Sequence, residues 1–108
     1  MFIQLIDKNG DKSPFLYIHH DYKEFLNEIE KWRQDLIQWR KNNPLDDGTP
    51  LGRGDVSTCI VDLLRHLTEY YVKTDAHNKG RITNTLCLYS TEDIDKEDEN
   101  ITIIKTYG

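Results

Sequence analysis

The sequence is poor in the features that commit a small chain to a special class of fold. Its 108 residues include two cysteines, Cys59 and Cys87, and each lies inside a segment of apolar periodicity. Two isolated cysteines do not form a disulfide framework, so we expect two buried, reduced thiols. No apolar stretch is long enough to act as a signal peptide or to span a bilayer. We therefore expect a cytoplasmic protein without a membrane partner.

The sequence also lacks the short motifs of common active sites. It has no Cys-x-x-Cys or His-x3-His spacing for a metal, no Walker loop and no Gly-x-Gly-x-x-Gly fingerprint. Gly52, Arg53 and Gly54 precede an expected helix start, where an anion can bind, but Asp55 at the cap position would repel phosphate. No serine or cysteine has a base nearby in the sequence. These absences favour a protein that is not an enzyme and that needs no cofactor.

Charge is the most unevenly distributed property of the chain. The net charge is −5, from 19 acidic and 14 basic residues. One stretch, here called the acidic segment, contains a single lysine and six acids: Glu92, Asp93, Asp95, Glu97, Asp98 and Glu99. The rest of the chain therefore carries 13 residues of each sign and is neutral. Such a segment repels nucleic acid and attracts a basic protein surface.

Alternating apolar patterns predict four β-strands, at residues 2–7, 15–19, 82–89 and 101–107. The first two flank Lys8–Asp11, where Asn-Gly is a strong turn signal, so we expect an antiparallel hairpin. The acidic segment joins the last two strands, and we expect it to be a hairpin loop.

Two helices are predicted between these strand pairs. The first begins at Asp21, with Glu24 three residues later as in a capping box, and ends near Asn42 before Pro44. Its apolar stripe consists of Tyr22, Phe25, Ile29, Trp32, Leu36 and Trp39, so both tryptophans are expected in the core. The second runs from about Asp55 to about Thr74, with a stripe of Val56, Ile60, Leu63, Leu67 and Tyr70.

The resulting order is ββααββ, which predicts one α+β domain over residues 1–108. One face of a sheet can cover two apolar helix stripes. We therefore expect a four-stranded antiparallel sheet with both helices packed on one of its faces.

Two clusters of residues could carry a function. Asp62, His66 and Glu69 share one face of the second helix and could bind a metal or act as acid and base, although an ordinary solvated face with Arg65 explains them as well. His19 and His20 point to opposite faces of their strand and do not easily grip one metal.

Tyr17 and Tyr89 fall on the sheet face away from the helices, together with Thr83, Thr85 and His19. An aromatic face of this kind is either a docking surface or a normal solvated sheet face.

Two functions are consistent with these patterns. The first is a small non-enzymatic module that binds a basic protein, of the same type as acidic inhibitors, immunity proteins and counter-defence proteins. The acidic segment, Tyr17 and Tyr89 would form its binding surface. The second is a small metal-binding protein or hydrolase that uses Asp62, His66 and Glu69.

Overall fold

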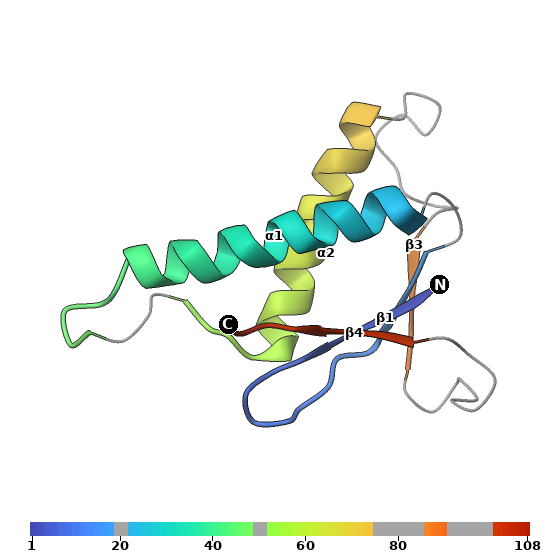
Figure 1. Ribbon diagram of the computed structural model, residues 1–108. Helices are drawn as coiled ribbons and strands as arrows, with labels where there is room; N and C mark the ends of the chain where they lie inside the picture. Colours follow the sequence, from blue (N-terminus) through green and yellow to red (C-terminus); the bar gives the residue numbers. More distant parts are fainter. Residues whose placement is uncertain (19–21, 49–51, 75–85, 91–100) are drawn as a thin grey trace.

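The computed structural model describes residues 1–18, 22–48, 52–74, 86–90 and 101–108, with residues 71–74 described by their backbone alone. Its elements are β1 (Phe2–Ile6), β2 (Phe15–Ile18), α1 (Tyr22–Asn42), α2 (Val56–Thr74), β3 (Leu86–Tyr89) and β4 (Ile101–Lys105). The predicted ββααββ order and α+β class are confirmed, and both helices lie on one side of the sheet (Figure 1). His19, His20, Asp21 and the first part of the predicted third strand lie outside the described residues.

The sheet is mixed, whereas the sequence predicted an antiparallel one. Its strand order is β3-β2-β1-β4. The pairs β1–β2 and β2–β3 are antiparallel, but β4 runs parallel to β1. Strands β3 and β4 are therefore the two edges and do not form a hairpin. A parallel pair needs a long crossover connection, and here both helices lie in the chain between β1 and β4.

The turn between β1 and β2 is held by a buried carboxylate. Gly10 has a φ of 84°, the left-handed conformation that glycine adopts without steric cost. Asp7 Oδ1 accepts hydrogen bonds from the backbone N–H groups of Asn9 at 3.0 Å and Asp11 at 3.1 Å. Its other oxygen, Oδ2, accepts the N–H of Val56 at 3.3 Å, at the first residue of α2. One side chain thus ties the turn to a helix that starts 49 residues later.

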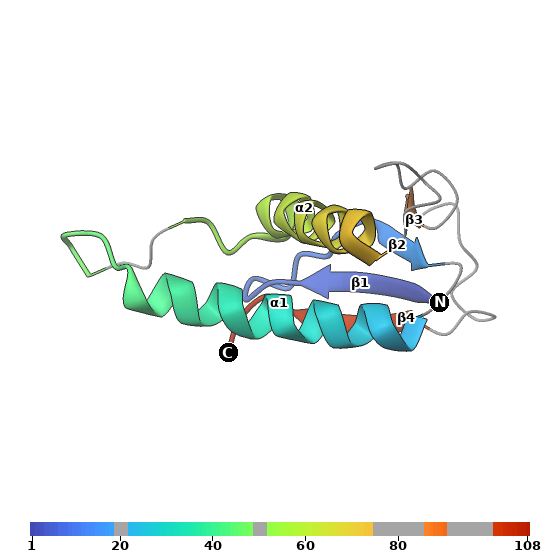
Figure 2. The same ribbon diagram turned by 90° about the horizontal axis from the view of Figure 1, so that it is seen from above.

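Helix α1 is longer than the sheet that it covers (Figure 2). Its 21 residues extend over about 32 Å, whereas a strand of five residues spans about 17 Å. The middle of its stripe is therefore buried, at Phe25, Ile29 and Trp32. The ends project past the sheet, and Tyr22 and Trp39 are 49% and 45% exposed. The expectation that Trp39 packs in the core is wrong for this reason.

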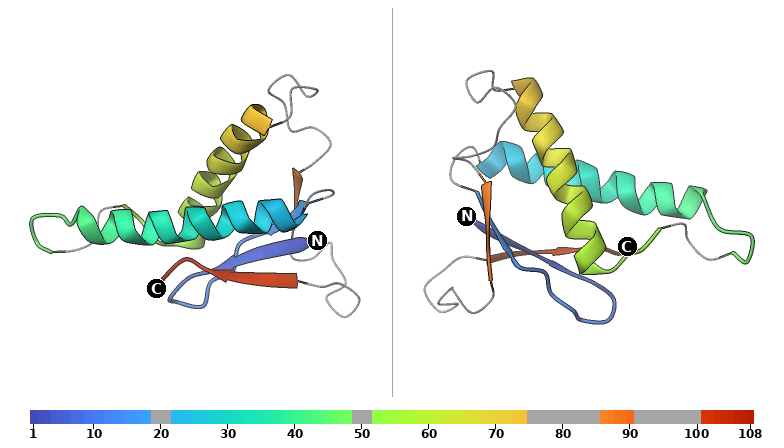
Figure 3. Two further views of the ribbon diagram at one scale, coloured as in Figure 1. Left: turned by 45° about the horizontal axis from the view of Figure 1, so that its top comes forward. Right: turned by 180° about the vertical axis from the view of Figure 1, so that it is seen from behind.

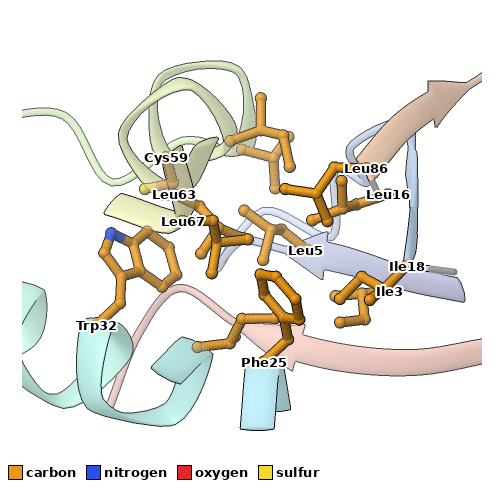
Figure 4. Packing of buried hydrophobic residues seen from close by; sticks show 13 residues of the cluster. Ile3, Leu5, Leu16, Ile18, Phe25, Trp32, Cys59, Leu63, Leu67 and Leu86 are labelled. Carbon is orange, nitrogen blue, oxygen red and sulfur yellow. The ribbon is translucent and has the colours of Figure 1, made fainter. Parts of the chain in front are cut away.

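The core lies between the helices and the sheet (Figure 4). Its buried residues are Ile3, Leu5, Leu16, Ile18, Phe25, Ile29, Trp32, Val56, Cys59, Ile60, Leu63, Leu67 and Leu86. The α2 stripe predicted from the sequence is in this list as far as Leu67, and Tyr70 is partly buried against Phe25 with ring centroids 5.6 Å apart. No helix in the described part of the chain is long and apolar enough to cross a membrane.

The last strand is fastened to α1 by a single arginine. Arg33 Nε donates to the carbonyl of Lys105 at 2.7 Å, and its Nη2 donates to the carbonyl of Tyr107 at 2.7 Å. These bonds anchor the C-terminal end of β4 at the helix. Hydrogen bonds from a charged donor contribute about 1.5–3 kcal/mol each, and less where solvent competes.

Candidate functional site

The predicted trio on α2 is divided among separate partners. Asp62 accepts a hydrogen bond from Trp32 Nε1 at 2.7 Å and another from Arg65 Nε at 3.1 Å. Glu69 accepts from Arg65 Nη1 at 3.1 Å. Both acids of the trio are therefore paired with the same guanidinium, and the two ion pairs raise the pKa of Arg65 above its ordinary value.

The third member, His66, faces α1 instead. Its Nε2 lies 3.6 Å from Glu28 Oε1, which is too long for a hydrogen bond, and this nitrogen is buried with no hydrogen-bond partner. Within the described ranges, no group of three or more His, Cys, Asp or Glu side chains is placed to hold a metal ion. In the described structure, the side chains of Asp62, His66 and Glu69 therefore contact separate partners and do not converge on one point.

Asp62 and His66, with Arg65, form the α2 side of a groove between the two helices, which cross on top of the sheet (Figure 3). The groove has a volume of about 280 Å³ and is lined by Trp32, Asp35, Leu36, Trp39, Asp62, Arg65 and His66. The α1 residues occur at steps of three and four, so they share one side of the helix. Trp32 lies at the buried end of this side and Trp39 at its exposed end.

The sheet face away from the helices carries an aromatic cluster: Phe2, Phe15, Tyr17 and Tyr89. Phe2 is at the centre, with its ring centroid 4.7 Å from that of Tyr17 and 5.9 Å from that of Tyr89. The centroids of Tyr17 and Tyr89 are 6.1 Å apart in an edge-to-face contact. The structure therefore places the two predicted tyrosines together, on neighbouring strands. Thr83, Thr85 and His19 lie outside the described residues.

Much of this cluster is closed to solvent. Phe15 is completely buried, Phe2 is 8% exposed and Tyr17 is half-buried. The most accessible member is Tyr89, which is 38% exposed; on the opposite edge of the same face, Ile103 of β4 is 46% exposed. The neighbouring Cys87 side chain raises the pKa of Tyr89 above its ordinary value of 10.0, first as a hydrogen-bond partner and then by electrostatic repulsion. Tyr89 is thus a neutral phenol throughout the physiological range.

The acidic segment lies outside the described residues, but both of its flanks are described. On one side Tyr89 contacts Phe2, and on the other Ile101 lies opposite Phe2 in the β1–β4 pairing. Glu92 follows Tyr89 by three residues and Glu99 precedes Ile101 by two. The described residues on both sides of the acidic segment, Tyr89 and Ile101, therefore lie beside Phe2 of the aromatic cluster. The segment joins opposite edges of the sheet, so the expected hairpin loop was wrong.

The glycine-rich approach to α2 is occupied by acids. Asp55 Oδ2 accepts the N–H of Thr58 at 3.3 Å, and Asp55 forms an ion pair with Arg53 at 2.9 Å. Burial alone would raise the pKa of Asp55, but the bonds from Thr58 and the charge of Arg53 together lower it below its ordinary value. Together with Asp7, which accepts the N–H of Val56 at the same helix end, Asp55 already occupies N–H groups that an anion would need, and both carboxylates repel a phosphate.

Sequence reasoning missed Asp35, Trp39 and Ile103 as surface residues of interest. Asp35 and Trp39 are four residues apart on α1, which is a visible signal, but Trp39 was assigned to the core because it continues the apolar stripe. Ile103 was predicted only as part of the fourth strand, without a face assigned to it. Its exposure depends on β4 being an edge strand, which local pattern does not encode.

Comparisons of the chain with protein-family models, with curated proteins and with solved structures found no match. A function is therefore proposed from the residues of the chain itself.

Proposed function

We propose that this chain is a non-enzymatic protein-binding module, and that its partner presents a basic surface. The observation that carries the proposal is that exposed apolar side chains and the two flanks of a highly acidic chain segment occur on the same face of the sheet. Tyr89 and Ile103 are exposed on the face away from the helices, on its two edge strands, and the described flanks of the acidic segment, Tyr89 and Ile101, both lie beside Phe2 of the aromatic cluster.

The two features serve different steps of binding. Exposed charges of one sign raise the rate of encounter with an oppositely charged protein, and their effect falls as salt is added. An exposed aromatic side chain contributes mainly to the lifetime of the complex, because it is desolvated only after docking. Acids confined to one segment beside such an aromatic residue suit a protein that captures and holds a basic partner, as an inhibitor or immunity protein does. Nucleic acid is disfavoured by the same charge.

We do not expect these acids to stabilise the fold. Exposed like charges repel one another, and exposed ion pairs contribute about 0–1 kcal/mol to stability. A segment that merely joined two edge strands would be better served by mixed signs. The competing explanation is that the acids prevent association between sheet edges, since β3 and β4 are edge strands.

A charge-neutralised variant separates these explanations. The variant replaces Asp93, Asp95, Glu97 and Asp98 with Asn or Gln, and the control replaces four exposed acids elsewhere, namely Asp11, Glu24, Glu30 and Asp46. Both changes alter the net charge equally. Affinity capture from the source cells identifies a partner, and its binding kinetics are then measured at several salt concentrations.

The neutralised segment should slow association at low salt and flatten its salt dependence, whereas the control should keep the wild-type rate constant. Tyr89→Ala should leave association unchanged and speed dissociation by about five- to thirty-fold, which corresponds to about 1–2 kcal/mol. If the neutralised variant and the control associate at the same rate, the acids do not steer a partner and the proposal fails.

A further inference from the structure

A second surface of the chain has a composition that the proposed function does not use. Trp39 lines the groove between α1 and α2 and is 45% exposed, so a large aromatic surface of a kind enriched at protein interfaces is open to solvent there. The chain at Gly52 passes close to one side of its ring, because a Cβ added at Gly52 would lie 3.4 Å from the Trp39 ring. The indole therefore lies against the chain on that side and is accessible elsewhere.

The groove around this indole is acidic. Asp35 and Asp62 line it directly, and Glu28 and Glu69 lie at its margins through their contacts with His66 and Arg65. Against these four carboxylates stand the guanidinium of Arg65 in the groove and the ammonium of Lys31 at its margin, 3.6 Å from Glu28. Arg65 is engaged by Asp62 and Glu69 at 3.1 Å each, so its charge is already compensated within the protein. An anion entering the groove would meet an excess of negative charge, whereas a cation would be attracted.

Asp35 is the carboxylate that remains available. It is exposed and lies four residues from Trp39 on the same side of α1, where Cβ atoms are about 6 Å apart. Among the described residues it makes no hydrogen bond or ion pair. A planar cation that stacked on the Trp39 ring could therefore donate to Asp35 without displacing any existing contact.

We propose that this groove binds the guanidinium group of an arginine side chain presented by the partner. Arginine fits better than lysine because its planar group stacks on indole and donates two parallel hydrogen bonds to a carboxylate. At about 280 Å³ the groove is at the lower limit for small-molecule sites, so it suits one side chain rather than a larger ligand. The proposal rests on the proposed function for the basic character of the partner, but the groove can be tested without that partner.

The probe is the peptide acetyl-Gly-Arg-Gly-amide, with the citrulline peptide as an uncharged control of the same shape. The chain has two tryptophans, so a ¹⁵N-labelled sample gives two indole N–H signals. We expect the arginine peptide to shift the signal of Trp39 in a saturable manner at low salt. The signal of Trp32, whose N–H is bonded to Asp62, should move less. The citrulline peptide should shift neither.

Variants locate the site. Asp35→Asn, followed through the Trp39 signal, should weaken peptide binding by about two- to five-fold, and Trp39→Ala, followed by amide shifts along α1 and α2, by a similar factor. Asp46→Asn, which removes an exposed acid outside the groove, should bind as the wild type does. Asp35 and Trp39 are both exposed, so we expect the two variants to fold as the wild type does. Circular dichroism checks this.

The proposal is overturned if the citrulline peptide binds equally well, or if Asp35→Asn and Asp46→Asn behave alike. It is also overturned if the peptide loses affinity only when the acidic segment is neutralised, because the guanidinium then binds there and the proposed function stands. A different outcome separates the two proposals. If peptide binding depends on Asp35 but the partner associates at the same rate with and without the charges of the acidic segment, the arginine site in the groove is supported and electrostatic steering by the acidic segment is refuted.

Discussion

Replacing Asp7 with alanine tests the contact that joins the β1–β2 turn to the start of α2. The Asp7 side chain is buried, with 4% of its surface exposed, and its carboxylate accepts three backbone N–H groups. Two of these donors, Asn9 and Asp11, are in the exposed turn, and the third, Val56, is buried at the beginning of α2. Alanine removes all three acceptor contacts at once.

The expected cost follows from the burial of each donor. A buried N–H left without a partner costs about 1–3 kcal/mol, which applies to Val56. The turn donors can be hydrated after the substitution, so each loses about 0.5–1 kcal/mol. The free energy of unfolding should therefore fall by about 2–5 kcal/mol. Asp7→Asn should cost less than Asp7→Ala, because the amide oxygen can still accept a hydrogen bond. It should not be neutral, because the amide NH2 group cannot accept the bond that the second carboxylate oxygen accepted.

Urea denaturation followed by circular dichroism measures this change. With a slope of about 1.5–2 kcal/mol/M, the midpoint for Asp7→Ala should fall by about 1–3 M at an unchanged slope. Asp11→Ala is the matched control, because its carboxylate is in the same turn and is exposed, and its side chain makes no hydrogen bond or ion pair with the described residues. Equal midpoints for the two variants would refute the idea that Asp7 couples the turn to the helix.

Three further predictions concern single side chains. Trp32→Ala should destabilise the protein by about 3–5 kcal/mol, whereas Trp39→Ala should cost less than about 1 kcal/mol. Similar urea midpoints for the two variants would contradict the observation that the C-terminal end of α1 projects past the sheet and leaves Trp39 exposed. Cys59 and Cys87 should not form a disulfide under oxidising conditions, because Cys59 lies in the core on the helix side while Cys87 pairs with Tyr17 on the opposite sheet face; a mass two hydrogens lighter with the native fold retained would disprove this. Burial raises the pKa of Cys59, so a thiol reagent at pH 8 should modify Cys87 first, and mass spectrometry of digested protein gives the order.

Local sequence pattern determined the elements of this protein. Apolar residues at steps of three and four predicted α1 and α2 within one or two residues of their bounds. A helix that buries one face needs apolar residues at its own period, so this pattern is visible in the sequence. Alternation likewise predicted that Leu86 faces the core while Tyr89 faces away from it, since neighbouring strand residues point to opposite faces.

The tertiary structure decided how these elements meet. The placement of β4 beside β1 depends on contacts between residues about 100 positions apart, and no local signal distinguishes that parallel pairing from a hairpin with β3. The exposure of Trp39 follows from the lengths of α1 and the sheet together, although its stripe position alone indicated burial. Asp7 read as the end of a strand, and its role as the acceptor for α2 arises because folding brings the Val56 N–H to it across 49 residues. Periodicity specifies which face a side chain occupies, but only the assembled chain specifies what lies opposite that face.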